Sequence, residues 1–237
     1  MFNRMSSVSV GAPRMHVLLA ALVVLIVTVA VPPRHAAAEQ YTPEDVVAVV
    51  QPQLDSFWSY VFSRWGLPYQ RPHNVLWYNI PGAPDPYSVC ELKRPNSIYC
   101  PSEATVYLDY TLHTNLISAG GDNTSGAIFA HEWAHHIQLL LGVTHAWQAQ
   151  QITTRSVELQ ADCFTGVFVR HLEYQGILEP GDLDEAATLM TAIGDDALGG
   201  PVNDPSGHGT SQERVAWFTY GYQTYNPGEC DPYNHGF

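Results

Sequence analysis

The chain has 237 residues, of which 23 are acidic and 10 are basic, and its formal net charge is −13 at pH 7. An acidic balance of this size repels phosphate backbones, so it argues against nucleic acid as a partner. Hydrophobic residues make up 46% of the chain, and its length suffices for one domain with a substantial core. We therefore expect no second globular domain.

Residues 1–38 have the pattern of a secretory signal. Arg4, Arg14 and His16 precede an apolar run over residues 17–31, and three alanines at 36–38 provide a small-residue cleavage site. The run is shorter than the roughly 18 to 20 residues that a transmembrane helix needs. We predict a cleaved signal and a secreted or extracytoplasmic domain over residues 39–237. The alternative is an uncleaved, single-pass N-terminal anchor, which would associate the protein with the membrane.

The first helix is predicted over residues 42–65. Thr42 is a candidate cap, Pro43 and Asp45 suit the first turn, and Pro52 predicts a kink. Apolar residues recur at helical spacing, namely Val46, Val50, Leu54, Phe57, Val61 and Trp65. This pattern is typical of a helix that packs on the core.

Three β-like runs follow, at residues 75–80, 97–100 and 105–110, and they predict a small antiparallel sheet. The run at 105–110 directly precedes the most unusual segment of the chain. If it is an edge strand, it could hold an extended peptide by main-chain hydrogen bonds. The alternative is an interior strand, and the sequence leaves both open.

The segment Ser125–Gly142 is apolar but carries three histidines and a glutamate within six positions. It reads as a helix, with Asn123, Thr124 or Ser125 as candidate N-caps and Gly142 as the residue that ends it. On such a helix His131 and His135 are about 40° apart and project from one face. The sequence therefore predicts a metal-chelating pair.

Glu132 lies about 100° around the helix from His131, which suits a general base better than a ligand. H-E-x-x-H on a helix is the zinc-peptidase signature, because two neutral nitrogens bind Zn²⁺ and the carboxylate takes a proton from the water that the metal activates. His136 points about 100° away from His135, so we interpret it as a packing residue or an outer support of the site.

Residues 152–174 predict a second long helix, which carries Glu158 and Asp162 on one face. Glu158 is the expected third ligand, and Asp162, one turn further on, is placed to accept the N–H of a ligand imidazole, most plausibly that of His131. Two histidines and one carboxylate leave the fourth position open, which is typical of catalytic zinc. The alternative for this acidic pair is a solvated helix face.

A third histidine ligand six residues after His135 is excluded, because that position is Leu141, and Gln138 replaces the glycine which that arrangement requires. The sequence therefore favours a site of the glutamate-ligand type.

A third helix is predicted over residues 182–192, followed by Asp195-Asp196 and a loop to Gly209. This acidic pair could bind Ca²⁺, but we favour hydrogen bonds to the loop or a cap, because alternating oxygen ligands are missing. Thr210 and Glu213 form a capping box that opens a last helix to about residue 222. His208, just before that cap, could donate a hydrogen bond to the oxyanion of an amide hydrolysis. The alternative is a structural bond or an unrelated surface position.

The four cysteines of an exported chain favour two disulfides. Of the three possible pairings we prefer Cys90 with Cys100 and Cys163 with Cys230. The alternative is a cysteine-rich metal site, which is disfavoured because no spacing resembles C-x-x-C and Cys163 lies inside a predicted helix.

The motifs AHEWAHHIQ, ELQADCFTG, IGDD and HGTSQERVAWF, in this order, resemble the putative neutral zinc metallopeptidases of bacteria, whose members are typically exported or membrane-anchored. The resemblance covers approximately residues 77–230. It implies a zincin-like fold, His131, His135 and Glu158 as zinc ligands, Glu132 as the catalytic acid and base, and paired cysteines. Two departures are Ala134, where the family usually has glycine, and the pair Gln212-Glu213, whose order is reversed.

We therefore expect a mainly helical α+β domain of zincin type, with one catalytic Zn²⁺ and a small antiparallel sheet before the metal helix. It would hydrolyse peptide bonds in a peptide or protein substrate. One alternative is an inactive zinc-containing domain that binds peptides or cell-envelope partners, and another is an amidase acting on non-peptide or cell-wall amides.

Overall fold

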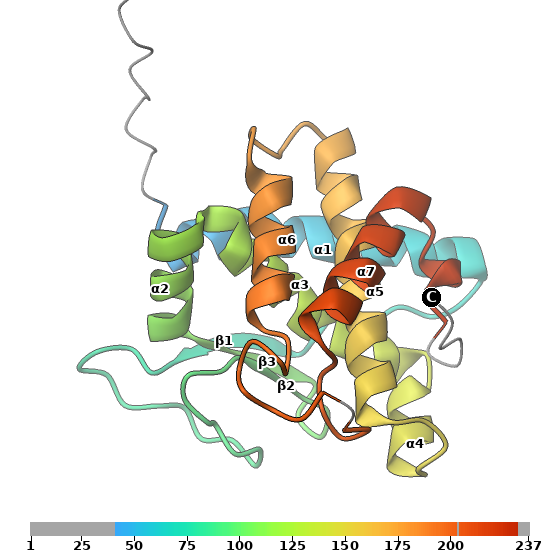
Figure 1. The fold of residues 1–237 in the computed structure, drawn as a ribbon, viewed down its shortest axis with the longest axis horizontal. Helices are drawn as coiled ribbons and strands as arrows, with labels where there is room; N and C mark the ends of the chain where they lie inside the picture. The colour runs from blue at the N-terminus through green and yellow to red at the C-terminus, as the bar shows by residue number, and fades with distance from the viewer. Residues whose placement is uncertain (1–40, 203, 232–237) are drawn as a thin grey trace, which may run out of the picture. The chain divides into compact units, whose positions relative to one another are not determined.

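The structure is a computed structural model that describes residues 41–202 and 204–231. The part described is mainly helical, with one small sheet (Figure 1). Its helices are α1 (Pro43–Trp65), α2 (Tyr110–Gly120), α3 (Asp122–Leu140), α4 (Val143–Gln148), α5 (Thr154–Tyr174), α6 (Asp182–Ala192), α7 (Ser211–Thr224) and the 3₁₀ helix η1 (Pro227–Glu229). Its strands are β1 (Asn74–Tyr78), β2 (Ile98–Cys100) and β3 (Thr105–Asp109).

The predicted signal or anchor, residues 1–38, lies outside the described residues. Within the described ranges, no helix combines the length and the apolar character needed to cross a membrane.

The sheet is mixed, with the order β1-β3-β2, so the prediction of an antiparallel sheet is wrong for one pair. β2 and β3 are antiparallel because only residues 101–104 join them, whereas β1 is parallel to β3. The long connection over residues 79–97 carries the chain across the sheet to its far side, which makes the parallel pairing accessible. β3 is the central strand and is buried throughout, so of the two alternatives left open for residues 105–110 the structure shows the interior strand. The edge strand on that side is β2.

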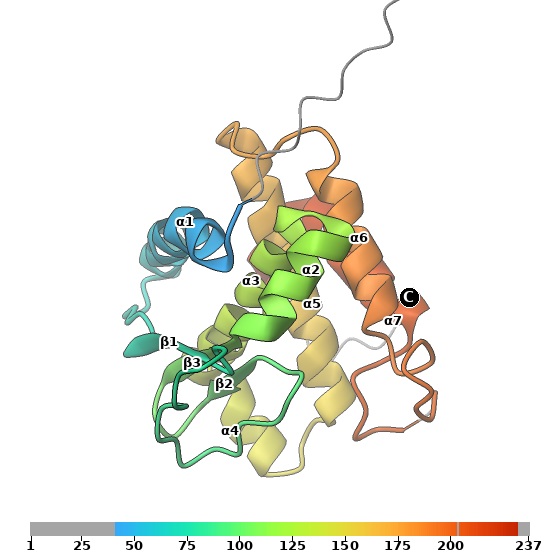
Figure 2. The same cartoon turned by 90° about the vertical axis from the view of Figure 1, so that its left-hand side faces the viewer.

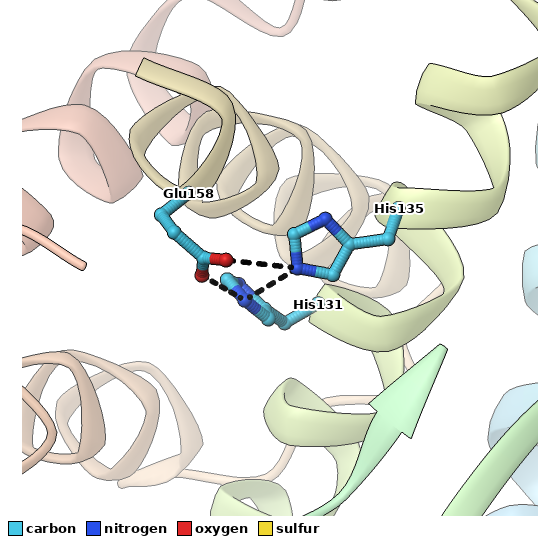
Figure 3. Close-up of side chains that lie close together, drawn as sticks. All are labelled: His131, His135 and Glu158. Atoms are coloured by element: carbon cyan, nitrogen blue, oxygen red, sulfur yellow. Dashed lines mark hydrogen bonds and ion pairs between the residues drawn. The ribbon is translucent and has the colours of Figure 1, made fainter. Parts of the chain in front are cut away.

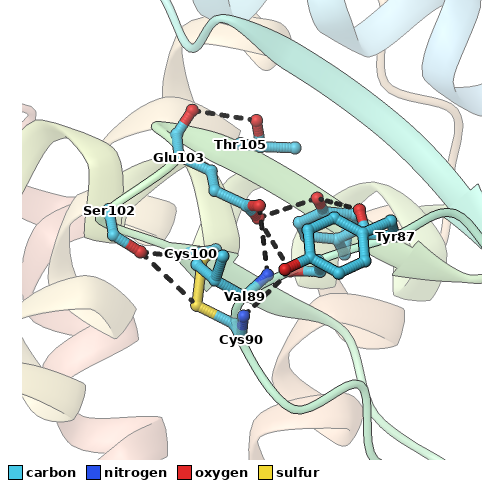
Figure 4. Close-up of a disulfide and its surroundings, with 9 residues drawn as sticks. Tyr87, Val89, Cys90, Cys100, Ser102, Glu103 and Thr105 are labelled. Carbon is cyan, nitrogen blue, oxygen red and sulfur yellow. Dashed lines mark hydrogen bonds between the residues drawn. A yellow bond between two sulfur atoms is a disulfide. The ribbon is translucent and has the colours of Figure 1, made fainter.

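The long connection is fastened to β2 by the predicted disulfide Cys90–Cys100 (Figure 4). Beside it, the carboxylate of Glu103 accepts hydrogen bonds from the Ser88 hydroxyl at 2.7 Å and from the Val89 amide at 3.1 Å. These bonds hold a segment without regular secondary structure against the sheet, so the position of β2 does not depend on its three residues alone.

α3 forms the centre of the helical part and contacts α1, α2, α5 and α6 (Figure 2). It begins at Asp122, so the candidate caps Asn123, Thr124 and Ser125 lie inside the helix rather than before it. Their side chains make other contacts: the Asn123 amide donates to the Asp182 carbonyl, and the Ser125 hydroxyl bonds His113. Gly142 has φ +79° and follows the end of α3, as predicted, whereas the short helix α4 after it was not predicted.

α1 keeps the predicted capping contacts at Thr42 and Asp45 and continues through Pro52 as a single helix. α2 was not predicted, and it follows β3 without a loop because Asp109, the last residue of β3, is its N-cap. The capping box of Thr210 and Glu213 opens α7 as predicted.

α5 and α7 pack with their backbones in direct contact. A Cβ atom at Gly166 would lie 1.9 Å from the Phe218 carbonyl oxygen, and one at Gly221 would lie 2.0 Å from that of Cys163. The second predicted disulfide, Cys163–Cys230, joins α5 to the chain after η1. This close packing fixes α7 against the face of α5 that carries Glu158 and Asp162.

Candidate metal centre

Three side chains from two helices meet at one point (Figure 3). α3 supplies His131 and His135, whose Nε2 atoms are 3.2 Å apart, and α5 supplies Glu158. The carboxylate spans both rings: Oε2 is 3.1 Å from Nε2 of His131, and Oε1 is 3.6 Å from Nε2 of His135. The predicted ligands therefore converge in space, although 23 residues separate His135 from Glu158 in the chain.

The tautomer of His135 follows from its neighbour Gln138. Nδ1 of His135 lies 2.8 Å from Oε1 of Gln138, while the amide nitrogen of Gln138 donates to the Val157 carbonyl and to Oε1 of Gln160. Since the amide nitrogen is engaged elsewhere, the oxygen faces His135 and accepts its N–H. The lone pair of His135 is therefore on Nε2, which points at Glu158.

His131 is arranged in the same way by Asp162. Its Nδ1 lies 3.0 Å from Oδ1 of Asp162, a close ion-pair contact that is not aligned as a linear hydrogen bond. Burial lowers the pKa of His131, but Asp162 and Glu158 outweigh it and raise the pKa to about 10. The two carboxylates beside the ring thus favour a positive charge at this place. Asp162 lies at Nδ1 as predicted, but the contact is an ion pair and not the predicted hydrogen bond.

The donor set fits a divalent cation. Two ring nitrogens and a carboxylate face each other at 3.1 to 3.6 Å, and each ring holds its Nδ1 toward an acceptor. The carboxylates favour a proton on His131, and a divalent cation between the three groups would take the place of that proton. Two imidazoles and one carboxylate are the donor set of catalytic zinc with an open fourth position.

Glu132 lines a cleft that also contains His131, His135 and Glu158, and 8% of its surface is exposed. Burial raises the pKa of its carboxyl to about 8, against which the charge of His131 and a hydrogen bond from the Tyr99 backbone act in the opposite direction. Tyr99 belongs to β2, so the sheet edge holds this carboxylate beside the candidate ligands. A carboxylate in this position can take up and release a proton near neutral pH.

His136 faces away from the metal centre. Its Nε2 donates to the Gln70 carbonyl at 2.7 Å, so Nδ1 accepts from the Tyr99 hydroxyl at 2.8 Å. This agrees with the interpretation as a packing residue that supports β2.

Arg214 and Gln138 are the residues that the sequence reading missed. Arg214 donates from Nε and from a terminal nitrogen to the two oxygens of Asp162, at 2.9 and 2.8 Å. Gln138 belongs to a chain of hydrogen bonds: it donates to Gln160, and the amide nitrogen of Gln160 donates to the Cys230 carbonyl at 2.6 Å. Arginine and glutamine at otherwise apolar helix positions were the available signals, because such residues are buried only when they are paired.

His208 lines the same cleft as the candidate ligands, with 57% of its side chain exposed. Oδ2 of Asp195 accepts the backbone N–H groups of His208 and Gly209, and Asp196 accepts from Ser211 at the start of α7. Both acidic side chains thus stabilise the loop and the start of α7, which agrees with the interpretation of Asp195 and Asp196 as partners of loop and cap hydrogen bonds. The structure gives the proposed calcium site no support.

The cleft has a volume of about 550 Å³. Elements far apart in the sequence form its walls: the edge of the sheet with residues 95–99, α2, α3, α4, α5, the end of α6, α7 and the loop that carries His208. It is thus large enough to take several side chains of a ligand beside the metal centre.

The fold and the site define a mainly helical α+β protein with an H-E-x-x-H helix and a His/His/Glu centre. The chain belongs to the family described as putative neutral zinc metallopeptidase, whose model matches residues 27–233. It is 35% identical over 205 residues to the uncharacterized protein YpfJ of Escherichia coli K12, covering 78% of this chain and 70% of that protein. It is also 35% identical over 189 residues to the uncharacterized protein Rv2575 of Mycobacterium tuberculosis, covering 70% and 64%. No solved structure matches the chain.

Proposed function

We propose that the protein is an exported, zinc-dependent peptidase with a zincin-like arrangement of its site. The observation that carries this proposal is the convergence of His131, His135 and Glu158 around one point, with Glu132 beside them in the same cleft. Zinc bound there would polarise the scissile carbonyl and acidify a water molecule. His131, His135 and Glu158 would hold it.

Glu132 has the role of general base and then general acid. Its carboxylate accepts a proton from the attacking water and delivers it to the nitrogen of the leaving amine. Burial raises the pKa of its carboxyl above the ordinary value, which strengthens the carboxylate as a base. Asp162 and Gln138 keep the two imidazoles oriented through their Nδ1 atoms, so that neither ring has to reorganise during the reaction.

His208 is the proposed donor to the oxyanion. Its ring lines the cleft and is mostly exposed, and its backbone N–H is fixed by Asp195. Nδ1 of the ring lies 3.4 Å from Oδ1 of Asp195, so Nε2 is the nitrogen proposed to donate to the oxygen on which negative charge develops.

The sheet supports a peptide as the substrate. β2 is an edge strand, and Ser97, Ile98 and Tyr99 line the cleft that contains Glu132. An extended peptide can add to such an edge by main-chain hydrogen bonds and thereby bring its scissile bond to the metal centre. The binding of an extended peptide, which the sequence analysis considered for residues 105–110, is therefore assigned to β2.

Export is proposed from residues 1–38 together with the two disulfides, which are compatible with an oxidising compartment. Cleavage of the signal is the expected outcome. Determining the N-terminus of the protein recovered from its native compartment would distinguish a chain beginning near residue 39 from an intact anchor.

The activity is tested with the zinc-loaded protein and its Glu132→Gln variant, which keeps the shape of the side chain but removes the base. We expect one zinc per chain in both proteins, cleavage of a mixed peptide library by the wild type, and a rate at least 100-fold lower for the variant. Chelation should abolish cleavage, and added zinc should restore it. Zinc binding without cleavage by either protein would instead support a binding domain, and cleavage confined to non-peptide amides would support an amidase.

A further inference from the structure

A group of apolar side chains from neighbouring helices lines one end of the cleft. Side chains from three helices and the following loop line this apolar end, and they are Leu112, Leu116, Ile128, Leu189, Ile193 and Leu198. The other end, between α4 and α5, is mixed, with Thr144, Trp147, Thr154 and Val157. The two ends of the cleft therefore offer different chemistry to a ligand that crosses the metal centre.

The apolar end begins next to the proposed catalytic base. Ile128 precedes Glu132 by four residues on α3, so both side chains share one face of the helix and lie about 6 Å apart along its axis. α2 and α6 both pack on α3 and contact each other (Figure 2), which places the side chains of the three helices around this end of the cleft.

Four of the side chains at the apolar end are anchored in the hydrophobic core, whereas Leu198 lies on a loop and is 69% exposed. Ile128 and Leu189 are 8% and 2% exposed and belong to the hydrophobic cluster between α3 and α6. Leu116 and Ile193 pack against that cluster and are half-buried, so each leaves part of its apolar surface open to the cleft. Exposed apolar surface beside a polar centre is a feature of binding sites, because a ligand that covers this surface removes it from unfavourable contact with water.

The described residues that line the cleft include no lysine and no unpaired arginine to receive an acidic side chain. Among the described residues that line it, Arg214 is the one arginine and there is no lysine. Arg214 is 3% exposed, and both oxygens of Asp162 engage it. The acidic residues Glu132 and Glu158 lie at the metal centre and not among the apolar side chains, so an apolar side chain is the group that this end accommodates without loss of solvation.

We infer that the apolar end is a specificity pocket that selects substrates with a bulky aliphatic or aromatic side chain next to the scissile bond. The inference rests on the proposed function, because it takes the molecule in the pocket to be a peptide substrate. It goes beyond that function, because the activation of water at the metal centre does not depend on which side chains of the substrate flank the scissile bond. Leu116 and Ile193 are the residues that set the size of the pocket.

The test uses a set of otherwise identical peptides in which each position flanking the scissile bond is Ala, Leu, Phe, Asp or Lys. For the zinc-loaded protein, kcat/KM should be about 10- to 100-fold higher for Leu or Phe than for Ala at one of these positions, and Asp should be the poorest. Leu116→Phe narrows the pocket and should lower the preference for Phe relative to Ala about tenfold, whereas Ile193→Ala should raise it. Leu67→Ala, a leucine that does not line the cleft, is the matched control and should leave the preference unchanged.

A second readout separates this inference from the proposed function. Equilibrium binding of the same peptides to zinc-loaded Glu132→Gln should show the same order, with Leu and Phe peptides at least tenfold tighter than Ala peptides. If the wild type cleaves peptides and neither Leu116→Phe nor Ile193→Ala changes its side-chain preference, the inference of a specificity pocket is wrong. The proposed peptidase function would then still stand. Selective binding without cleavage would overturn the peptidase and keep the pocket, and absence of both would overturn both. Zinc content and thermal unfolding establish that each variant is folded.

Discussion

Arg214 of α7 binds both carboxylate oxygens of Asp162 of α5, at 2.9 and 2.8 Å, and both side chains are buried. Asp162 in turn contacts Nδ1 of His131. The packing of two helices is thereby connected to a candidate metal ligand, and the Gly166 and Gly221 contacts bring the helices close enough for this to occur.

Replacing Arg214 with methionine should destabilise the fold. The variant leaves the Asp162 carboxylate buried without its main partner, so we expect the free energy of unfolding to fall by about 3 to 5 kcal/mol. Chemical denaturation measures this loss. The double variant Asp162→Asn with Arg214→Met should lose less than the sum of the two single variants, because the uncompensated charge is removed. Additive losses would contradict the assigned pairing.

Asp162→Asn alone should weaken zinc binding. The amide no longer supplies a negative charge to the Nδ1 side of His131, so we expect the affinity for zinc to fall roughly 10- to 100-fold. Competition with a chromophoric chelator gives the affinity. Asp204→Asn changes an exposed loop carboxylate and is the matched control. An affinity equal to that of the wild type would show that Asp162 does not support the ligand.

Gln138 should be as important for the other imidazole. Gln138→Leu removes the acceptor of the His135 N–H and the donor to the Val157 carbonyl, and we expect zinc affinity to fall roughly 10- to 100-fold. Gln138→Glu retains an acceptor and should bind zinc more tightly than Gln138→Leu. Gln151→Leu, at an exposed position, is the control. The reverse order of the two Gln138 variants would exclude this role.

His113 should make stability depend on pH. Burial lowers the pKa of its imidazole to about 3, while the unfolded state protonates near 6.5. Between these values the unfolded state binds more protons, so stability is lost as the pH falls below 6.5, by about 1.4 kcal/mol per pH unit or roughly 2 kcal/mol at pH 5. His113→Gln should flatten the dependence of the unfolding free energy between pH 7 and pH 5.

His73→Gln, an exposed histidine, is the control for that measurement and should keep the slope of the wild type. If His113→Gln and the wild type lose the same stability between pH 7 and pH 5, His113 is not neutral in the folded protein.

The two disulfides should differ in their effect. Cys163–Cys230 closes a loop of 67 residues and Cys90–Cys100 one of 10, so replacing each pair with alanine should cost roughly 4 and roughly 3 kcal/mol. Only loss of Cys163–Cys230 should also weaken zinc binding, because the Cys230 carbonyl anchors Gln160 and through it Gln138. Unfolding and zinc titration of the two double variants test both statements. A weaker zinc site after loss of Cys90–Cys100 alone would contradict this route.

Local patterns in the sequence were sufficient for the long helices and for the pair on α3. The spacing of His131 and His135 places them on one face of any helix, whatever surrounds it. The capping box of Thr210 and Glu213 likewise depends on residues three positions apart, which is why the start of α7 was predicted correctly.

The sheet and the supports of the site were decided by tertiary structure. No local signal distinguishes a parallel from an antiparallel neighbour, so the order β1-β3-β2 and the edge position of β2 became known only from the fold. The same holds for Gln138, whose partners lie 19 and 22 residues away, and for Arg214, which meets Asp162 across 52 residues.

The sequence by itself therefore determined which residues could bind a metal and activate water, because helical periodicity links nearby positions by fixed geometry. Only the tertiary structure decided that Glu158 meets the two histidines, that β2 borders the cleft and that one end of the cleft is apolar. Those relationships join segments distant in the chain, and the packing of α3 against α5 and α6 sets them.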